Sequence, residues 1–387
     1  MRVALFTDTF YPQVNGVART IERTALLLAR AGHEVRVYAP SSDPAAAKGC
    51  GGEAYAVEIL PSISSGIYKG ERIAFPTGAA LRAMRENPPD LIHSHTPFGA
   101  GLAAVRAARR LQVPLVGTHH TFFDHYLKHI GLDYAPVRRA TWSYTAWYYN
   151  RCDLVLSPTR ALLSAMEGSG LKRPSEVVPN PADTALFAPP TAAQKREAKK
   201  MLGIAGPAAL YLGRLSYEKS VDQALRAFTF AAAREPRLSF IMAGDGPERG
   251  RLEALAAALG VAHRVRFTGF AGGEALLAAL HAADVSISAS KSENMPLAVL
   301  ESLAAGLPVV AVSSLGMREL VEDGVNGFLC EPDKPEDLAG RLLSLVSDES
   351  LRAEFSARAR ASAMRFDPAR VAVALLGAYA RARGFSG

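Results

Sequence analysis

Short apolar runs alternate with amphipathic stretches along most of the chain. The first run, VALFTDTF, is apolar and then turns polar, as a buried strand followed by a loop does. A helix is expected from Val17 to Ala31, with Gly32 at its carboxyl end. Further strand-like runs are EVRVYAP, DLIHSH, PLVGTHH, DLVLSPT and SEVVPN. Strands that alternate with helices are typical of βαβ units, so the sequence predicts an α/β fold with a parallel sheet.

The alternation stops in a proline-rich stretch, residues 179–190, and then begins again. The later strands are expected in AALYLGR, LSFIMAGDG, HRVRFTGF, DVSISAS, LPVVAV and GFLC. One core rarely serves more than ~250–300 residues, and this chain has 387. We predict two doubly wound domains, residues 1–183 and 184–366. Residues 367–387 are expected to form a long helix that joins the first domain.

Composition narrows the class of protein. With 49% hydrophobic and 21% charged residues, the chain is neither disordered nor collagen-like. Its longest nearly apolar run, residues 303–312, is too short to span a bilayer. Asp8 interrupts the first apolar run too early for a signal peptide, so a cytoplasmic location is expected. The three cysteines lack CxxC spacing and are expected to be free thiols.

The chain is basic, and the excess lies mainly in its first half. The net charge is +7, and residues 1–183 hold 20 Lys and Arg against 15 Asp and Glu. A basic half suits an acidic partner, namely nucleic acid, a phosphate-bearing substrate or an anionic membrane surface.

Ligands of open parallel sheets bind beyond the carboxyl ends of the strands. In the first such loop, Gly16 precedes a helix and lets the backbone approach a phosphate, although a plain turn glycine is the alternative. No GxGxxG dinucleotide fingerprint is present there. In the second half, Arg214 and Lys219 follow the strand AALYL and are candidates to bind a diphosphate; the alternative is a pair of solvated surface cations.

Two carboxylates follow a later strand at Glu-x7-Glu spacing. Glu293 is expected on a loop and Glu301 on the second turn of a helix whose first turn contains Pro296. Carboxylates accept hydrogen bonds from hydroxyls, so both are candidates to hold sugar hydroxyl groups. The alternative for Glu301 is an ordinary helix carboxylate, but its apolar neighbours argue against that.

Four histidines, His93, His95, His119 and His120, follow two apolar runs. Zinc is one interpretation, but no acidic or thiol ligand accompanies them. A histidine that hydrogen-bonds the substrate is favoured, and no metal is expected.

Aromatic and basic side chains gather between Phe122 and Arg151. This segment holds 9 of the 30 aromatic residues, including Trp142 and Trp147, together with Arg138 and Arg139. Such a mixture suits an anionic membrane interface, and a helix that packs its rings in the core is the alternative. Nucleic acid is disfavoured because no stripe of Lys and Arg is present.

Taken together, these motifs resemble the glycosyltransferase family 4 enzymes. The resemblance rests on FTDTFYPQVNGVA, HSHTP, THH, GRLSYEKS, AGDGP, VRFTGF and SENMPLAVLESLAAGLPVVA, and it covers nearly the whole chain. It implies a GT-B fold of two facing Rossmann-like domains with a cleft between them. It also implies a retaining, metal-independent hexosyltransferase without a cofactor. THHTFFDHYLKHI is most similar to the lipid-directed members.

The resemblance also implies roles for single residues. Arg214 and Lys219 would bind the donor diphosphate, Glu293 the donor sugar and Glu301 the ribose. His120 would lie near the reacting sugar carbon, and Gly16 near the diphosphate or the transferred sugar. The remaining donor contacts would be Phe270 beside the base, and the N–H groups of Leu297 and Ala298 at the phosphate.

Two positions depart from the family pattern. Ser220 follows Lys219 where glycine is frequent, and the linker reads Pro179-Asn180-Pro181, which suggests a stiffer hinge.

The expected partners are a nucleotide-sugar donor, a lipid acceptor and the cytosolic face of a membrane. UDP-glucose with diacylglycerol is favoured over GDP-mannose with a phosphoinositide. A soluble or polysaccharide acceptor, a sugar-nucleotide epimerase and a non-catalytic nucleotide-sugar binder stay open as alternatives.

Overall fold

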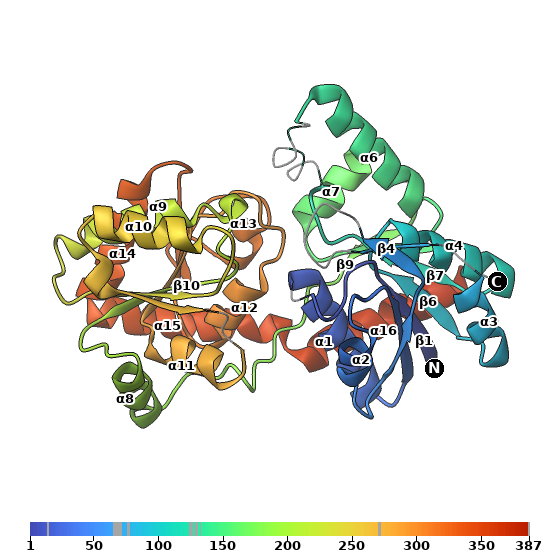
Figure 1. Cartoon of the computed structure of the whole chain (residues 1–387), viewed down its shortest axis with the longest axis horizontal. Helices are drawn as coiled ribbons and strands as arrows, with labels where there is room; N and C mark the ends of the chain where they lie inside the picture. Colours follow the sequence, from blue (N-terminus) through green and yellow to red (C-terminus); the bar gives the residue numbers. More distant parts are fainter. Residues whose placement is uncertain are drawn as a thin grey trace. The chain divides into compact units, whose positions relative to one another are not determined.

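The computed structural model describes residues 1–13, 15–64, 72–75, 78–123, 127, 131, 133–269 and 272–385. The chain forms two compact units. Unit 1 comprises Met1–Pro181 and Pro368–Gly387, and unit 2 comprises Ala182–Asp367. The sequence-based boundary, between residues 183 and 184, lies two residues further along the chain. In each unit, helices cover both faces of one sheet (Figure 1).

Unit 1 contains a seven-stranded parallel sheet with the order β3-β2-β1-β6-β7-β8-β9. Its strands are β1 (Arg2–Phe6), β2 (Glu34–Ala39), β3 (Ala56–Ile59), β6 (Leu91–Ser94), β7 (Leu115–Thr118), β8 (Leu154–Ser157) and β9 (Ser175–Val177). A separate antiparallel pair consists of β4 (Ser62–Ser64) and β5 (Arg72–Ala74). The helices are α1 (Gly16–Arg30), α2 (Pro44–Gly49), α3 (Ala79–Glu86), α4 (Gly99–Leu111), α6 (Ala135–Tyr149), α7 (Arg160–Gly168) and α16 (Pro368–Gly384).

Unit 2 contains a six-stranded parallel sheet with the order β12-β11-β10-β13-β14-β15. Its strands are β10 (Ala208–Leu212), β11 (Ser239–Ala243), β12 (Val265–Gly269), β13 (Val285–Ser288), β14 (Val309–Val312) and β15 (Gly327–Cys330). The helices are α8 (Ala192–Met201), α9 (Val221–Ala232), α10 (Arg249–Ala258), α11 (Glu274–Ala282), α12 (Leu297–Ala304), α13 (Met317–Leu320), α14 (Pro335–Ser347) and α15 (Glu349–Ala363). Among the described residues of unit 2, short 3-10 helices span Tyr217–Lys219, Ala262–Arg264 and Met364–Phe366.

The start and end of α1 follow from its sequence. The Asn15 side chain accepts a hydrogen bond from the Ala18 N–H and caps the first turn. Ile21, Ala25 and Leu28 recur at helical spacing and are buried against the sheet. Gly32 then takes a positive φ of 79°, which ends the helix. The observed helix begins and ends one residue earlier than the sequence predicts.

The core of unit 1 has two layers. On one face of the sheet, α1 and α16 pack against Val3, Leu5 and neighbouring strand residues. On the other face, α3, α4, α6 and α7 cover Ala4, Phe6 and Ile92. Helix α16 therefore belongs to unit 1, although it follows unit 2 in the sequence.

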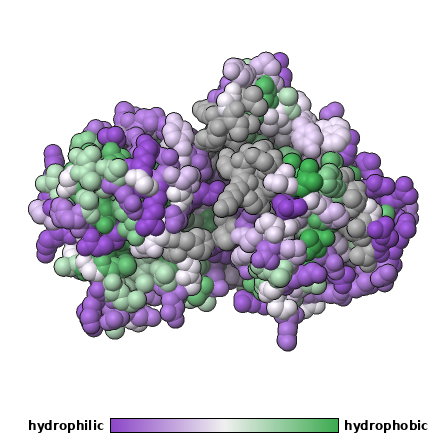
Figure 2. Space-filling view, in the orientation of Figure 1, coloured by the Kyte–Doolittle hydropathy of each residue, from purple (hydrophilic) through white to green (hydrophobic). Residues whose placement is uncertain are grey.

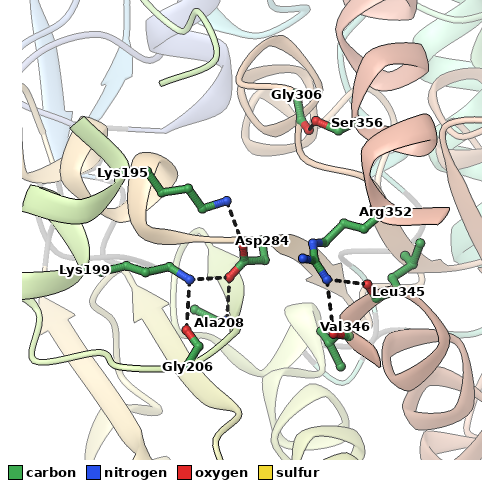
Figure 3. A network of polar contacts seen from close by, with 10 residues as sticks. All are labelled: Lys195, Lys199, Gly206, Ala208, Asp284, Gly306, Leu345, Val346, Arg352 and Ser356. Atoms are coloured by element: carbon green, nitrogen blue, oxygen red, sulfur yellow. Dashed lines mark hydrogen bonds and ion pairs between the residues drawn. The ribbon is translucent and has the colours of Figure 1, made fainter. Parts of the chain in front are cut away.

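An ion-pair network around the buried Asp284 fixes the first helix of unit 2 (Figure 3). Lys195 and Lys199, one turn apart on α8, each place Nζ 2.7 Å from a different carboxylate oxygen of Asp284. Asp284 also accepts a hydrogen bond from the Ala208 N–H at the start of β10. Burial alone would raise the pKa of Asp284, but the two lysines hold it below its ordinary value. This network lies at the amino ends of β10 and β13.

The strand order reverses between β1 and β6 in unit 1 and between β10 and β13 in unit 2. Ligands of doubly wound sheets bind at the carboxyl edge beside such a reversal. No helix in the described part of the chain has both the length and the apolar character to cross a membrane.

Candidate functional site

The loop after β1 leads directly into α1 and is held by its own polar side chains. Asn15 donates from Nδ2 to Thr9 Oγ1, and Thr9 donates in turn to Gln13 Oε1. Gly16 is the first residue of α1 and is exposed. A Cβ atom built on Gly16 would meet no heavy atom within 4 Å. Packing within unit 1 therefore gives no reason for glycine at this position.

Asp8, on the same loop after β1, forms hydrogen bonds to the segment that follows β6, the neighbouring strand at the switch point. Its carboxylate accepts hydrogen bonds from the Thr96 hydroxyl at 2.6 Å and from the Ala100 N–H at 2.8 Å. Helix α4 has no cap from its own N-cap residue, Phe98, so Asp8 satisfies a free N–H of its first turn. Burial raises the pKa of Asp8, and these hydrogen bonds oppose that shift.

The four histidines of HSH and THH gather at the carboxyl ends of β6 and β7, which are parallel neighbours. His93 places Nδ1 2.7 Å from the Tyr379 hydroxyl of α16 and Nε2 2.6 Å from Thr118 Oγ1. His95 Nδ1 lies 3.0 Å from His120 Nε2. His119 has neither ring nitrogen hydrogen-bonded and packs against Phe123, Trp142 and Tyr149.

Burial keeps these imidazoles neutral. It lowers the pKa of His93 and of His119 to about 3, and that of His120 to about 4. The pKa of His95 is also well below its ordinary value, mainly through burial and secondarily through His93 and His120. In the described part of the chain, no three His, Cys, Asp or Glu side chains are arranged to hold a metal ion.

The two tryptophans of α6 that the sequence suggested for a membrane surface lie in different environments. Trp142 is half-buried and packs edge-on against His119 and Phe122. Trp147 is 45% exposed, stacks with Tyr144, and carries the Arg151 guanidinium 3.6 Å from its ring centre. Trp142 therefore packs partly against the core of unit 1, and Trp147 lies on the surface.

The two arginines of α6 also differ. Arg138 forms an ion pair with Asp133, whereas Arg139 is exposed and has no ion pair or hydrogen bond with any residue that the structure describes.

Trp147 belongs to an exposed group that we call the aromatic patch, consisting of Phe75, Phe98, Tyr144 and Trp147. Its segments adjoin one another, because the Tyr144 hydroxyl donates to the Pro97 carbonyl and Gly99 lies against Ala74. Figure 2 shows hydrophobic patches among the hydrophilic side chains that dominate the visible face.

In unit 2, the loop after β10 carries Arg214 and is fixed by main-chain contacts. The N–H groups of Gly213 and Leu215 donate to the carbonyls of Ala243, the last residue of β11, and Asp245, which follows that strand. Gly244 and Gly246 permit this approach, because a Cβ on either would lie about 2 Å from a carbonyl oxygen of the loop. The buried Tyr211 hydroxyl donates to the Arg214 carbonyl at 2.8 Å.

The Arg214 side chain is exposed and has no polar partner among the residues that the structure describes. A rigid backbone thus presents an available guanidinium at the switch point of unit 2.

Lys219 and Glu293 meet across the switch point of unit 2. Lys219 Nζ lies 2.6 Å from Glu293 Oε1, and both side chains are mostly buried. Lys219 follows β10 and Glu293 follows β13, the parallel neighbour of β10. The Gly316 N–H donates to the Glu293 carbonyl, and a Cβ on Gly316 would lie 1.5 Å from the Asn294 carbonyl oxygen. The close approach at Gly316 therefore fixes the loop that carries Glu293.

Helix α12 begins directly after this loop. It starts at Leu297, so Pro296 is its N-cap residue and not part of the first turn as expected. The N–H groups of Leu297 and Ala298 make no hydrogen bond to another described residue. Glu301 lies inside the helix and is 2% exposed. Free N–H groups at a helix start favour an anion.

The sequence missed several residues that shape the site. Tyr211 and Gly316 act through other residues, and no local motif singles them out. His95 was named as one of the four histidines, but its contact with His120 was not expected. Asp8 was visible only as the polar end of a strand. Phe270, expected beside the base, lies outside the described residues.

Solved structures of other proteins share this fold of two parallel-sheet units. The crystal structure of HepE from Anabaena in complex with UDP superposes with a TM-score of 0.81 and 22% identity, covering 98% of this chain and 99% of that one. The sucrose-phosphate synthase of Thermosynechococcus elongatus gives a TM-score of 0.82 and 18% identity, covering 98% of both chains. The expected α/β fold is confirmed: two Rossmann-like parallel-sheet units are the architecture of the GT-B glycosyltransferases.

Two family models and a relative similar in sequence show to which family of glycosyltransferases the chain belongs. The model described as Glycosyltransferase Family 4 matches residues 14–186, and the model described as Glycosyl transferases group 1 matches residues 194–362. The alpha-monoglucosyldiacylglycerol synthase of Streptococcus pneumoniae is 31% identical over 89% of this chain and 78% of that protein. The chain belongs to glycosyltransferase family 4 and is a hexosyltransferase, as the motifs predicted.

Proposed function

We propose that this enzyme transfers a hexose from a nucleotide diphosphate sugar to a lipid at an anionic membrane surface. The observation that carries the proposal is the Lys219–Glu293 pair, 2.6 Å apart at the switch point of unit 2. In this proposal, Lys219 is the cation for the diphosphate and Glu293, beside it, is the carboxylate for the sugar. The name of the Streptococcus pneumoniae relative, a glucosyldiacylglycerol synthase, favours glucose and diacylglycerol.

The donor would bind along the carboxyl edge of unit 2. Arg214 has an exposed guanidinium there, and Lys219 is fixed by Glu293. Together they supply the two cations that neutralise a diphosphate, and the N–H groups of Leu297 and Ala298 add donors at a helix start. Glu293 would accept hydrogen bonds from the sugar hydroxyls, and Glu301 from the ribose. The HepE crystal structure, which is a complex with UDP, supports a nucleoside diphosphate as the leaving group.

The reaction would proceed with retention of the anomeric configuration. The bond between the anomeric carbon and the diphosphate oxygen breaks, and Arg214 and Lys219 stabilise the negative charge left on that oxygen. The acceptor hydroxyl attacks on the face from which the diphosphate departs, and the departing phosphate takes the hydroxyl proton. Unit 1 would supply His120 and Gly16 to the transferred sugar. Positioning and charge neutralisation need no metal ion and no cofactor in this scheme.

The acceptor would come from a membrane at the aromatic patch of unit 1. Phe75, Phe98, Tyr144 and Trp147 are exposed there, each between 37% and 45%. Arg139 lies on α6, and Arg151 follows the end of this helix by two residues. Rings with polar tips settle at headgroup depth, and cations bind anionic lipid. The enzyme would therefore act as a peripheral protein on the cytosolic face of a membrane.

Transfer to anionic vesicles tests the proposal. Vesicles of diacylglycerol in phosphatidylglycerol, with UDP-[14C]glucose, are expected to yield a labelled lipid. Arg214→Ala and Lys219→Ala are expected to lower kcat/KM by about 100-fold or more, because each removes a charge from the leaving group. Glu293→Ala should do the same, since it removes a sugar contact and leaves Lys219 without its carboxylate. GDP-[14C]mannose with phosphatidylinositol is the second substrate pair.

Lys334→Ala is the matched control. Lys334 pairs with Glu331 on the surface of unit 2, so its loss should leave transfer unchanged. Full activity in all three site variants would refute the site assignment. A labelled soluble product in place of lipid would refute the lipid acceptor but not the donor site.

A further inference from the structure

We propose that His95 is a positioning residue that fixes the tautomer of His120, so that His120 carries its proton on Nδ1. The His120 imidazole would then carry an N–H donor on Nδ1 and not a bare, basic nitrogen. The inference rests on the proposed function for the role of His120, but the tautomer itself does not depend on that role.

The two rings meet because their strands are neighbours. In the register of β6 and β7, Ser94 lies opposite Gly117, so the residues that follow both strands emerge side by side. The His95 N–H donates to the Phe6 carbonyl and the His119 N–H to the Leu156 carbonyl, which extends the sheet into both histidine segments. The backbone thus fixes where each imidazole begins.

The geometry between the rings is that of an in-plane hydrogen bond. His95 Nδ1 and His120 Nε2 are 3.0 Å apart, the ring centres are 5.3 Å apart, and the ring planes differ by 19°. Nearly coplanar rings at this separation place the hydrogen bond close to the line between the centres. Both the N–H bond and the lone pair of an imidazole point along that direction.

Only one proton occupies this hydrogen bond. Both rings are neutral, since burial lowers the pKa of His120 to about 4 and that of His95 well below its ordinary value. Each ring therefore has one N–H and one bare nitrogen, and two arrangements are possible. Either His95 donates from Nδ1 to a bare His120 Nε2, or His120 donates from Nε2 to a bare His95 Nδ1.

The far nitrogen of His95 decides between the two arrangements. His95 Nε2 is buried and has no hydrogen-bond partner. If His120 were the donor, the proton of His95 would sit on Nε2 as a buried N–H without an acceptor. Such orphaned N–H groups are rare, and an unfilled acceptor is tolerated more often. The proton of His95 therefore belongs on Nδ1, which leaves His120 Nε2 as the acceptor and puts the proton of His120 on Nδ1.

The neighbours of His95 hold its ring in place. The His93 ring packs against it with centres 4.0 Å apart, and His93 is itself held on both nitrogens by Tyr379 and Thr118. His95 is 3% exposed, so its ring lacks the room to turn over. The orientation that selects the tautomer is thus maintained by the core of unit 1.

Two variants of His95 separate positioning from simple packing. His95→Asn places an amide nitrogen where Nδ1 lies and can still donate to His120 Nε2. His95→Leu is similar in size but cannot donate. Variant His120→Gln assigns the His120 signals, and His281→Leu, at a half-buried histidine of α11 in unit 2, is a control for the removal of any imidazole.

Ring-nitrogen NMR of the 15N-histidine-labelled enzyme tests the inference without any substrate. The native enzyme and His95→Asn are expected to show His120 as the Nδ1–H tautomer, and His95→Leu as a mixture or as Nε2–H. In the transfer assay, His95→Leu should lower kcat by about tenfold with little change in the donor KM, the size expected for one hydrogen bond. His95→Asn should restore most of that loss.

An Nε2–H tautomer for His120 in the native enzyme would overturn the inference. So would an Nδ1–H tautomer that persists in His95→Leu. If the NMR results hold and His120→Gln transfers sugar at the native rate, the proposed role of His120 fails and the positioning by His95 stands.

Discussion

At the scale of single residues, the glycines of the candidate site differ in whether the fold requires glycine at their positions. Gly244 and Gly246 are required by the fold, because a side chain on either would collide with the backbone of the Arg214 loop. Gly16 differs, since open space surrounds it and its backbone avoids the left-handed region. A glycine that neither packing nor φ requires suggests that a ligand needs the space. Gly16 is therefore the residue at which stability and activity are expected to separate most clearly.

We predict that Gly16→Ala stabilises the fold and impairs transfer. Alanine should raise the free energy of unfolding by about 0.5 kcal/mol by restricting the unfolded chain. Its methyl group should lower transfer by about tenfold or more by occupying the space of the donor. Urea unfolding and the vesicle assay measure the two effects.

Gly250→Ala is the matched control for Gly16→Ala. Gly250 lies in the first turn of α10 and is equally unobstructed, so alanine there should stabilise without loss of activity. Native transfer by Gly16→Ala would remove Gly16 from the site.

At the scale of elements, α6 shows how one helix serves two environments. Trp142 and Trp147 are five residues apart, which turns them by about 140° around the helix axis. Trp142 faces the histidine cluster, and Trp147 faces solvent beside Tyr144. The composition of the sequence predicted an aromatic and basic segment, but it did not show which aromatic side chains face the core and which face solvent. Aromatic residues lie on several sides of this helix, so no single apolar face stands out in the sequence. Only the outward side is available to a membrane.

We predict that Trp147→Ser weakens binding to anionic vesicles by about tenfold. Half of an indole ring is exposed, and its burial in the headgroup region contributes more than about 1 kcal/mol. Flotation with phosphatidylglycerol vesicles measures the bound fraction. The variant should keep its native free energy of unfolding, because Trp147 is outside the core.

Phe230→Ser serves as the control for vesicle binding. Phe230 is 46% exposed on α9 of unit 2, almost the same as Trp147 at 45%. Equal losses for the two variants, or no loss for Trp147→Ser, would exclude the aromatic patch as the membrane contact.

At the scale of the whole molecule, the two units differ in their response to acid. Unit 1 holds four neutral histidines, three of them buried in its core, whereas His281 is the one histidine of unit 2 with a lowered pKa among the described residues. A histidine with a folded-state pKa below 6.5 binds fewer protons folded than unfolded. Its contribution to stability is complete above pH 6.5 and is lost as the pH falls from there toward the folded-state pKa.

We predict that unit 1 loses stability steeply between pH 7 and pH 5. His93 and His119, with pKa values of about 3, should each cost about 1.4 kcal/mol per pH unit below 6.5. Both tryptophans lie in unit 1, so tryptophan fluorescence in urea follows this unit alone. Asp8, whose pKa burial raises, acts in the opposite sense nearer its own range, which is why pH 5 is the lower limit.

His119→Leu isolates one of these contributions. Neither ring nitrogen of His119 has a hydrogen-bond partner, so leucine should not lower stability at pH 7.5. The dependence on pH should become shallower by about 1.4 kcal/mol per unit. An unchanged slope would show that His119 titrates normally in the folded state.

The sequence predicted the class of fold and the loops that carry Arg214, Lys219 and Glu293, because strands and strand ends are local patterns. It did not predict which side chains meet. Lys219 and Glu293 are 74 positions apart and are joined only because β10 and β13 are neighbours. The His95–His120 contact, likewise, depends on the pairing of β6 with β7. The residue pairs depend on strand order, and a single sequence does not state that order directly.

Helix α16 also has a consequence for synthesis. It covers one face of the first sheet with Val371, Leu375 and Tyr379, yet the ribosome makes it after all of unit 2. The nascent chain must therefore carry an uncovered apolar face of unit 1 while some 190 further residues are translated. During that interval, we expect the exposed face to bind chaperones or to promote aggregation.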